Sequence, residues 1–232
     1  MVWNVNGISD SKNDLHGILD YLNTFDVVML VETRVESIDK DFLLDYSIAH
    51  IPASKSGKAG QGILLGVKKS RYYHVQDWTS DDTSLWVKIT FGQGARPLFV
   101  GCTYIPPSGS PLLTGISAEQ RFENLQLQIL AATEMGDVIC GGDFNARIGD
   151  RGNDTGLGRL SRGCTDTGVN AFGTKLLELC RVSDCLLCTG IVGGDEAQHL
   201  RIGQQCVQGQ RGQIMSLFPR RMHLRNVFIA AE

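Results

Sequence analysis

Three strand-like segments follow one another in the middle of this chain, with no helical pattern between them. Residues 62–67, 85–89 and 98–104 are rich in aliphatic side chains and are separated by turns that contain Gly, Ser and Asp. Strands that are joined without an intervening helix pair in antiparallel or mixed sheets. This part of the chain is therefore predicted to be mostly sheet.

Helical patterns and further strand patterns flank this run on both sides. Residues 26–31 and 138–140 are short apolar runs, typical of strands that are covered on both faces. Helical spacing recurs in three stretches, and the second begins with a capping-box pattern at Ser117 and Gln120. The apolar positions of these stretches are Leu15, Ile18, Leu19 and Leu22; Phe122, Leu125, Ile129 and Leu130; and Phe172, Leu176, Leu177 and Cys180.

This order of elements predicts an α/β sandwich, in which two mixed sheets pack together and helices cover the outside. A single doubly wound sheet is the alternative, although no Gly-rich phosphate loop follows the first strand-like segment at residues 2–7. The length of 232 residues and the apolar fraction of 42% suffice for the core of one domain of this kind.

The composition narrows the class of protein. The formal net charge of -3 gives no overall attraction to polyanions, so a nucleic-acid contact needs a local basic or metal-bearing surface. No apolar run approaches the roughly 20 residues that span a bilayer, and no signal-peptide pattern is present. We therefore expect no membrane association and an intracellular protein, nuclear or cytoplasmic.

The seven cysteines do not form a disulfide framework pattern, and Cys185 and Cys188 are interpreted as core residues.

Polar side chains that could take part in catalysis or metal binding lie at or near the ends of predicted strands, where a rigid scaffold can direct them into one cleft. They are Asn4, Asn6, Glu32, Tyr104, Asp143 and Asn145. A carboxylate such as Glu32 is costly to bury alone and should face water or a cation, and few hard oxygen ligands plus solvent suit magnesium. Taken singly, each piece also fits an ordinary turn or an exposed strand end.

Five motifs occur in an order that carries a resemblance. The series WNVNGI, MLVETR, GQGILLGV, CTYIPP and GGDFNARIGD resembles the endonuclease/exonuclease/phosphatase superfamily over about residues 2–190, within the usual boundary uncertainty. The stretch from Arg162 to Cys180 is similar to the endonucleases of LINE-type, non-LTR retrotransposons. The resemblance implies a four-layer, DNase I-like sandwich over residues 1–192, and DNA as the partner.

The same resemblance implies a role for each candidate residue. Glu32 would bind the divalent metal, Mg²⁺ or alternatively Mn²⁺, and no other small-molecule cofactor is expected. Asn4 and Asn6 would line the metal and phosphate site. The catalytic residues would be Tyr104, which contacts the scissile phosphate, Asp143, which orients or deprotonates the attacking water, and Asn145, which holds that water and stabilises charge on the phosphoryl oxygens. The implied reaction is metal-dependent phosphodiester hydrolysis, and the oligomeric state is left open.

The pattern fails near the C-terminus, where the family carries an Asp-Tyr strand and a final Ser-Asp-His strand. None of the five histidines follows a Ser-Asp pair; they are His16, His50, His74, His199 and His223. Residues 200–220, read one base earlier with freely chosen codons, can spell FTYRPTVRPRSAWTDYVLVSP, which resembles the family continuation. We therefore predict a frameshift near Gln198, and a tail at 193–232 that lies outside the family and is poorly ordered; a divergent basic tail is the alternative.

Three functions remain open at the level of the sequence. The first is a DNA endonuclease derived from a retrotransposon. The second is a catalytically dead remnant that lacks the Ser-Asp-His strand of the family. The loss of one donor that contacts the transition state, such as this histidine, costs about a hundred-fold or more in rate. The third is a phosphatase or lipid phosphodiesterase of the same superfamily, since the fold alone does not assign the substrate.

Overall fold

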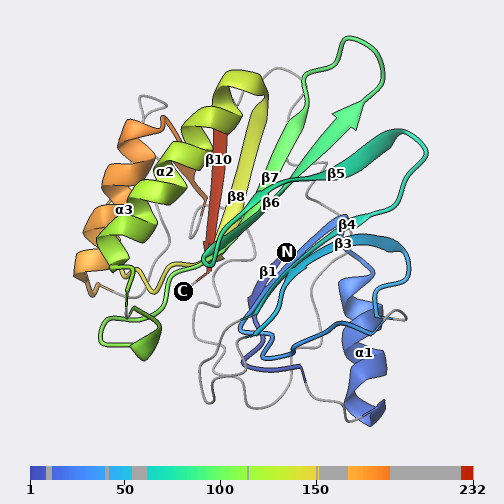
Figure 1. Ribbon diagram of the computed structural model, residues 1–232, viewed down its shortest axis with the longest axis horizontal. Helices are drawn as coiled ribbons and strands as arrows, with labels where there is room; N and C mark the ends of the chain where they lie inside the picture. Colours follow the sequence, from blue (N-terminus) through green and yellow to red (C-terminus); the bar gives the residue numbers. More distant parts are fainter. Residues whose placement is uncertain are drawn as a thin grey trace.

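The computed structural model describes residues 1–8, 12–39, 42–53, 62–113, 115–149, 151, 167–188 and 226–231. Two mixed sheets pack face to face, with α1 on the outer side of one sheet and α2 and α3 side by side on the outer side of the other (Figure 1). The predicted two-sheet α/β sandwich is confirmed, and the single doubly wound sheet is excluded. Among the described residues, no helix is long and apolar enough to cross a membrane.

The smaller sheet contains four strands in the order β1-β2-β4-β3. They are β1 (Val2–Asn4), β2 (Val27–Val31), β3 (Tyr46–Ile51) and β4 (Ile63–Lys68). β1 and β2 run parallel, whereas β4 is antiparallel to both of its neighbours. The helix α1 (Lys12–Leu22) connects β1 to β2, as a parallel pair requires.

The larger sheet contains six strands in the order β5-β6-β7-β8-β10-β9. They are β5 (Tyr73–Ser80), β6 (Ser84–Phe91), β7 (Leu98–Tyr104), β8 (Asp137–Asp143), β9 (Leu186–Leu187) and β10 (Asn226–Ala231). The first three are antiparallel neighbours, while β7, β8, β10 and β9 run parallel. The helix α2 (Ala118–Met135) connects β7 to β8, and α3 (Ala171–Val182) precedes β9.

The continuous apolar run in β2 is explained by burial on both faces. Met29 and Val31 pack into the core between the sheets, while Val28 and Leu30 pack on the outer side with Leu22 of α1. Successive side chains of a strand point to opposite faces, so both sets must be apolar. In the larger sheet, alternate residues of β7 likewise divide between the inner core and the helix-covered core.

Three observed strands were not predicted from the sequence, namely β3, β5 and β10. β10 lies within residues 193–232, and it pairs with β8 along six positions that end with Ala231 opposite Asp143. The prediction that this tail is out of frame and outside the family stays a prediction. The other residues of the tail lie outside the described residues.

The interpretation of Cys185 and Cys188 as packing residues agrees with their surroundings. Cys185 belongs to the core beneath α2 and α3, and Cys188 is half-buried; their thiols donate to the backbone carbonyl oxygens of Ser183 and Leu186. Burial raises the pKa of the Cys185 thiol to about 12, so this side chain stays protonated and unreactive at neutral pH.

Candidate active site

The candidate residues meet at one edge of the sandwich because the strands that carry them run in matching directions. Asn4 is the last residue of β1, and Glu32 directly follows β2, its parallel neighbour. Tyr104 and Asp143 are the last residues of the parallel strands β7 and β8, and they stand opposite each other in the register. β1 lies against β8, so the strand ends of the two sheets come together.

A network of hydrogen bonds joins the two carboxylates. The amide nitrogen Nδ2 of Asn4 donates to Oε1 of Glu32 at 3.0 Å and to Oδ2 of Asp143 at 2.8 Å. The hydroxyl of Tyr104 donates to the same Oε1 of Glu32 at 2.9 Å. The structure therefore brings together four residues that the sequence selected from four separate strands.

Asn6 lies at the exposed rim of this network and contacts it through Asn4 and Arg34. Its backbone N–H donates to Oδ1 of Asn4 at 3.1 Å, which fixes the orientation of the Asn4 amide. Arg34 donates from Nη2 to Oδ1 of Asn6 and, at 3.1 Å, to Oε2 of Glu32. Arg34 was not a predicted site residue.

Asn145 lies beside Asp143 and holds it through the backbone. The N–H of Asn145 donates to Oδ1 of Asp143 at 2.9 Å, while its side-chain amide donates to the carbonyl oxygen of Ile105 at 2.9 Å. The first contact is the Asx-type turn that the Asp-x-Asn spacing indicated. Both oxygens of Asp143 are thus engaged, one by Asn145 and one by Asn4.

Asn170 is a second residue of this region that the sequence did not select for the site. It is the N-cap of α3, and its Oδ1 accepts from the backbone N–H groups of Gly173 at 2.7 Å and of Arg147 at 3.0 Å. Its Nδ2 donates to the carbonyl oxygen of Asn145 at 2.9 Å. One side chain therefore both caps α3 and holds the backbone of Asn145 and Arg147, which follow β8.

Backbone strain is concentrated at these residues. Positive φ is costly for residues other than glycine and is maintained only where the surrounding structure enforces it. Six such residues occur in the described part of the chain, and four of them are in the site: Asn6 at 49°, Glu32 at 54°, Arg34 at 56° and Asn145 at 48°. Such a concentration of strained residues is typical of a preorganised functional site.

Burial controls the electrostatics of the site. Asp143 is only 7% exposed, and this burial raises the pKa of its carboxyl, with the charge of Glu32 acting in the same direction; the hydrogen bonds from Asn145 and Asn4 oppose the shift. Burial also raises the pKa of Tyr104, and so does the hydrogen bond from its hydroxyl to Glu32. Tyr104 is therefore a neutral hydrogen-bond donor at physiological pH.

The donor set fits a hard divalent cation. The two carboxylates lie together on Nδ2 of Asn4, with the side-chain oxygen of Asn6 at the rim on Arg34, and Mg²⁺ binds few protein oxygens while it keeps several waters. Oε1 of Glu32 already accepts two hydrogen bonds, whereas Oε2 accepts one, from Arg34, so Oε2 is the oxygen that has a lone pair left for a cation. Among the described residues, no group of three or more His, Cys, Asp or Glu side chains is arranged so that it could hold a metal ion by itself.

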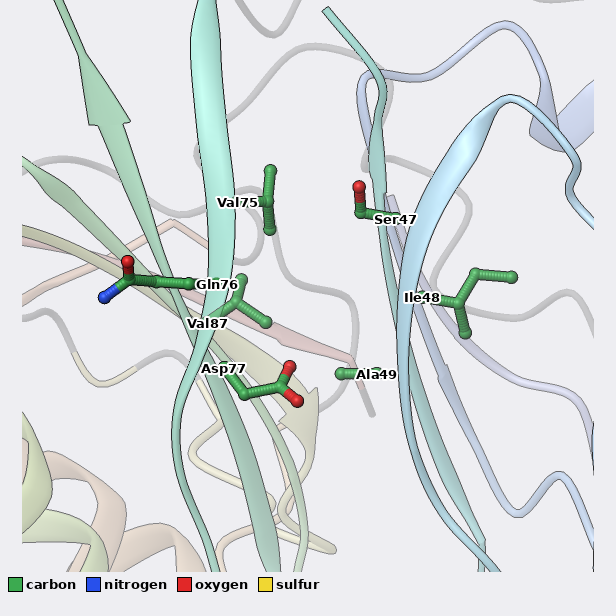
Figure 2. A pocket seen from close by; sticks show the side chains of 7 residues that line it. All are labelled: Ser47, Ile48, Ala49, Val75, Gln76, Asp77 and Val87. Atoms are coloured by element: carbon green, nitrogen blue, oxygen red, sulfur yellow. The ribbon is translucent and has the colours of Figure 1, made fainter.

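Histidine is absent from the network formed by the described side chains. His50 and His74 lie on β3 and β5, each of which is an edge strand of its sheet. A cavity of about 280 Å³ lies between these strands, and Figure 2 shows Val75 and Asp77 on one side of it and Ser47 and Ala49 on the other. This cavity shares no residue with the polar network.

The fold is similar to those of two solved endonucleases. The AP endonuclease LMAP from Leishmania major matches with a TM-score of 0.55 and 18% identity, over 78% of this chain and 65% of that chain. The endonuclease domain of TRAS1, a telomere-specific non-LTR retrotransposon, matches with a TM-score of 0.51 and 15% identity, over 78% of this chain and 70% of that chain. The chain thus spans 65% of the length of the first of these relatives.

The family itself is shown by the sequence. No curated protein matches the chain. The model of the Endonuclease/Exonuclease/phosphatase family matches residues 1–194, which include every residue of the polar network, and the chain therefore belongs to the Endonuclease/Exonuclease/phosphatase family.

Proposed function

We propose that this site hydrolyses phosphodiester bonds of DNA with the help of Mg²⁺. The observation that supports this most strongly is the pair of carboxylates, Glu32 and Asp143, that meet on the single amide nitrogen of Asn4. Two acidic groups at a sheet edge, one half-buried and one buried, are electrostatically costly unless a cation or a reacting phosphate uses them. Family membership supports hydrolysis of a phosphoester as the reaction class, and the DNA substrate is the finer proposal.

Glu32 is the proposed metal ligand, with Asn4 and Asn6 as the residues that line the metal and phosphate site. A divalent cation bound there supplies Lewis-acid stabilisation of the phosphoryl oxygens. Mn²⁺ offers the same hard-ligand chemistry and is the alternative cation. Asn4 holds Glu32 in place, because its amide is itself oriented by the backbone N–H of Asn6.

Asp143 is the proposed general base, which orients and deprotonates the attacking water. A base works best when its pKa lies near the operating pH, and burial shifts the pKa of Asp143 in that direction. The N–H of Asn145 fixes one of its oxygens, so the carboxylate keeps a defined orientation. Asn145 is proposed to help hold the water, and it is anchored for this role by Ile105 and Asn170.

Tyr104 is the proposed contact to the scissile phosphate. Its hydroxyl is protonated at neutral pH and lies within hydrogen-bond distance of Glu32, at the same site where the phosphate would bind. A neutral donor here stabilises negative charge that develops on a phosphoryl oxygen.

A catalytically dead remnant is the second candidate, and one observation favours it. The strand next to β8 is β10, which ends with Ala230 and Ala231 opposite Gly142 and Asp143. The sequence Ala230-Ala231 contains no polar side chain, whereas the family resemblance implies an Asp-Tyr step and a Ser-Asp-His step on the last strands. We therefore expect activity well below that of a complete family member, by about a hundred-fold or more.

Plasmid nicking tests the proposed function. Supercoiled plasmid is incubated with the purified chain in Mg²⁺ or Mn²⁺, beside the variants Glu32→Gln and Asp143→Asn. Slow nicking that both variants abolish supports the proposal. Equal nicking by the variants rejects the assigned residues. Activity on a phosphoinositide headgroup without nicking assigns a phosphatase or lipid phosphodiesterase instead, and no turnover of either substrate assigns the remnant.

A retrotransposon source is proposed from residues 162–180, of which 167–180 are described and include the start of α3. The proposed frameshift near Gln198 belongs to the same account. Sequencing the coding DNA tests it: the neighbouring frame should encode the peptide with the Asp-Tyr step, and any other reading there removes the frameshift from the account.

A further inference from the structure

Arg34 is the one basic side chain that the described structure bonds directly to the polar network. Its Nη2 lies 3.1 Å from Oε2 of Glu32 and also donates to Oδ1 of Asn6. The side chain is 47% exposed, whereas that of Glu32 is 15% exposed. A guanidinium at the rim of the site therefore meets the carboxylate that is proposed to bind the metal.

The hydrogen bonds of Glu32 dictate which oxygen a cation would use. A carboxylate oxygen offers about two lone-pair sites, and those of Oε1 are taken by Asn4 and Tyr104. A cation can therefore reach Glu32 only through Oε2, which is the oxygen that Arg34 contacts. Two positive groups on one oxygen repel each other strongly at this distance, so a metal and the guanidinium compete.

The local backbone presents Arg34 in this position without packing its head group into the protein. Arg34 has a φ of 56°, and its Cδ lies 3.5 Å from the position that a Cβ at Gly7 would occupy, so its stem lies alongside the backbone at Gly7. The exposed guanidinium is thus held through its stem and two hydrogen bonds. It can leave Glu32 without disturbing the core.

We propose that Arg34 is an internal placeholder cation: it neutralises Glu32 before the divalent metal binds, is displaced from Oε2 by that metal, and then binds the phosphate of the substrate. Guanidinium groups suit this second role, because they bind phosphate oxygens with directed hydrogen bonds. Metal binding therefore increases the affinity of the site for DNA. This inference rests on the proposed function, since it uses Glu32 as the metal ligand.

The test compares Arg34→Met, which keeps an apolar stem and removes the charge, with the matched control Arg181→Ala. Arg181 also pairs with an exposed carboxylate, that of Glu178 on α3, outside the site. Mn²⁺ alone is titrated by electron paramagnetic resonance of the free ion. Arg34→Met should bind Mn²⁺ on the order of tenfold more tightly than the wild type, and Arg181→Ala should bind as the wild type does.

The second measurement is the affinity for a short fluorescent DNA duplex in Ca²⁺, read by anisotropy. Arg34→Met should bind the duplex more weakly, whereas Arg181→Ala should not change. Unchanged Mn²⁺ affinity or unchanged DNA affinity of Arg34→Met overturns the inference. Glu32→Gln separates the two proposals: if it leaves Mn²⁺ binding intact, the metal site itself is wrong, and if it abolishes binding while Arg34→Met changes nothing, only the role of Arg34 is wrong.

Discussion

The carboxylates of Glu32 and Asp143 accept hydrogen bonds from the same amide nitrogen, although the two residues belong to different sheets. Asn4 thus connects the C-terminal ends of strands in the two sheets and holds two like charges near each other. Repulsion between the carboxylates opposes this arrangement, and the shared donor offsets part of it. The site is therefore poised to accept positive charge.

The Asn4 bridge gives the first prediction. Asn4→Ala removes the shared donor, so the two carboxylates should move apart and the proposed metal ligand should lose its orientation. We expect nicking to fall on the order of 10- to 100-fold, as for other residues that orient a metal ligand. The measurement is the plasmid-nicking rate at saturating Mn²⁺. An unchanged rate would show that the bridge is not needed for activity.

The buried carboxyl of Asp143 gives a prediction on pH. Because its pKa is raised in the folded protein, the stability that it contributes is complete below the pKa of the unfolded chain and is lost as pH rises through the folded value. The wild type should therefore lose stability relative to Asp143→Asn as pH rises above 4, the region of the ordinary Asp pKa. Urea unfolding of both proteins across pH measures this, and parallel curves would contradict it.

The same residue predicts the pH dependence of the reaction. Asp143 must be deprotonated to act as a base, so kcat/KM should rise with pH through its raised pKa. Asp143→Asn should lower the rate by about 100-fold or more at pH values above that raised pKa, because a general base contributes that much. A variant that keeps the ascending limb would assign that limb to another group.

Asn170 connects helix capping to the site, and Ser117 provides a matched control. Both are N-caps whose side chains accept from a backbone N–H, but only Asn170 also holds the carbonyl oxygen of Asn145. Replacing either by alanine should cost about 1 kcal/mol of stability. Only Asn170→Ala should also slow nicking, on the order of tenfold, through misplacement of Asn145.

An equal loss of activity in Ser117→Ala, measured at matched stability, would show that capping alone explains the effect. Rescue by Asn170→Asp tests the contacts further. Aspartate keeps the cap but has no amide to donate to Asn145, so it should restore stability and leave the rate low.

Gly142 tests the close approach of β7 and β8 beside Asp143. A Cβ at Gly142 would lie 1.8 Å from the carbonyl oxygen of Thr103, and the residue has a φ of 150°. Gly142→Ala should therefore destabilise the fold by about 3 kcal/mol. Gly17→Ala is the control, since its Cβ meets no atom within 4 Å in α1, and it should stabilise by about 1 kcal/mol. The melting temperatures of both variants measure these changes in stability. Similar melting temperatures would contradict the close packing at Gly142.

The sequence predicted the buried part of the fold better than its edges. β2, β4, β6, β7 and β8 are apolar runs because both faces are covered, and that signal is visible in the residues alone. β3 and β5 are edge strands with half-buried and exposed polar residues, and β5 contains a bulge between Asp77 and Thr79, so neither shows clear alternation. The position of β10 depends on its pairing with β8, which no local pattern reveals.

The site was predictable to the extent that its residues close strands. Asn4, Glu32, Tyr104 and Asp143 follow this rule, and the structure brings them together. Arg34 lies two residues past Glu32, where both residues adopt positive φ, so no strand pattern points to it. Asn170 donates to Asn145 from 25 positions further along the chain, so its second role depends on a tertiary contact that no local pattern reveals.

Anomalous diffraction from crystals grown with Mn²⁺ tests the central claim most directly. The account predicts one strong peak coordinated by Glu32, with the carboxylate of Asp143 facing the same solvent-accessible edge and Arg34 turned away from Oε2. A peak bound elsewhere, or carboxylates of Glu32 and Asp143 on opposite surfaces, would contradict the account.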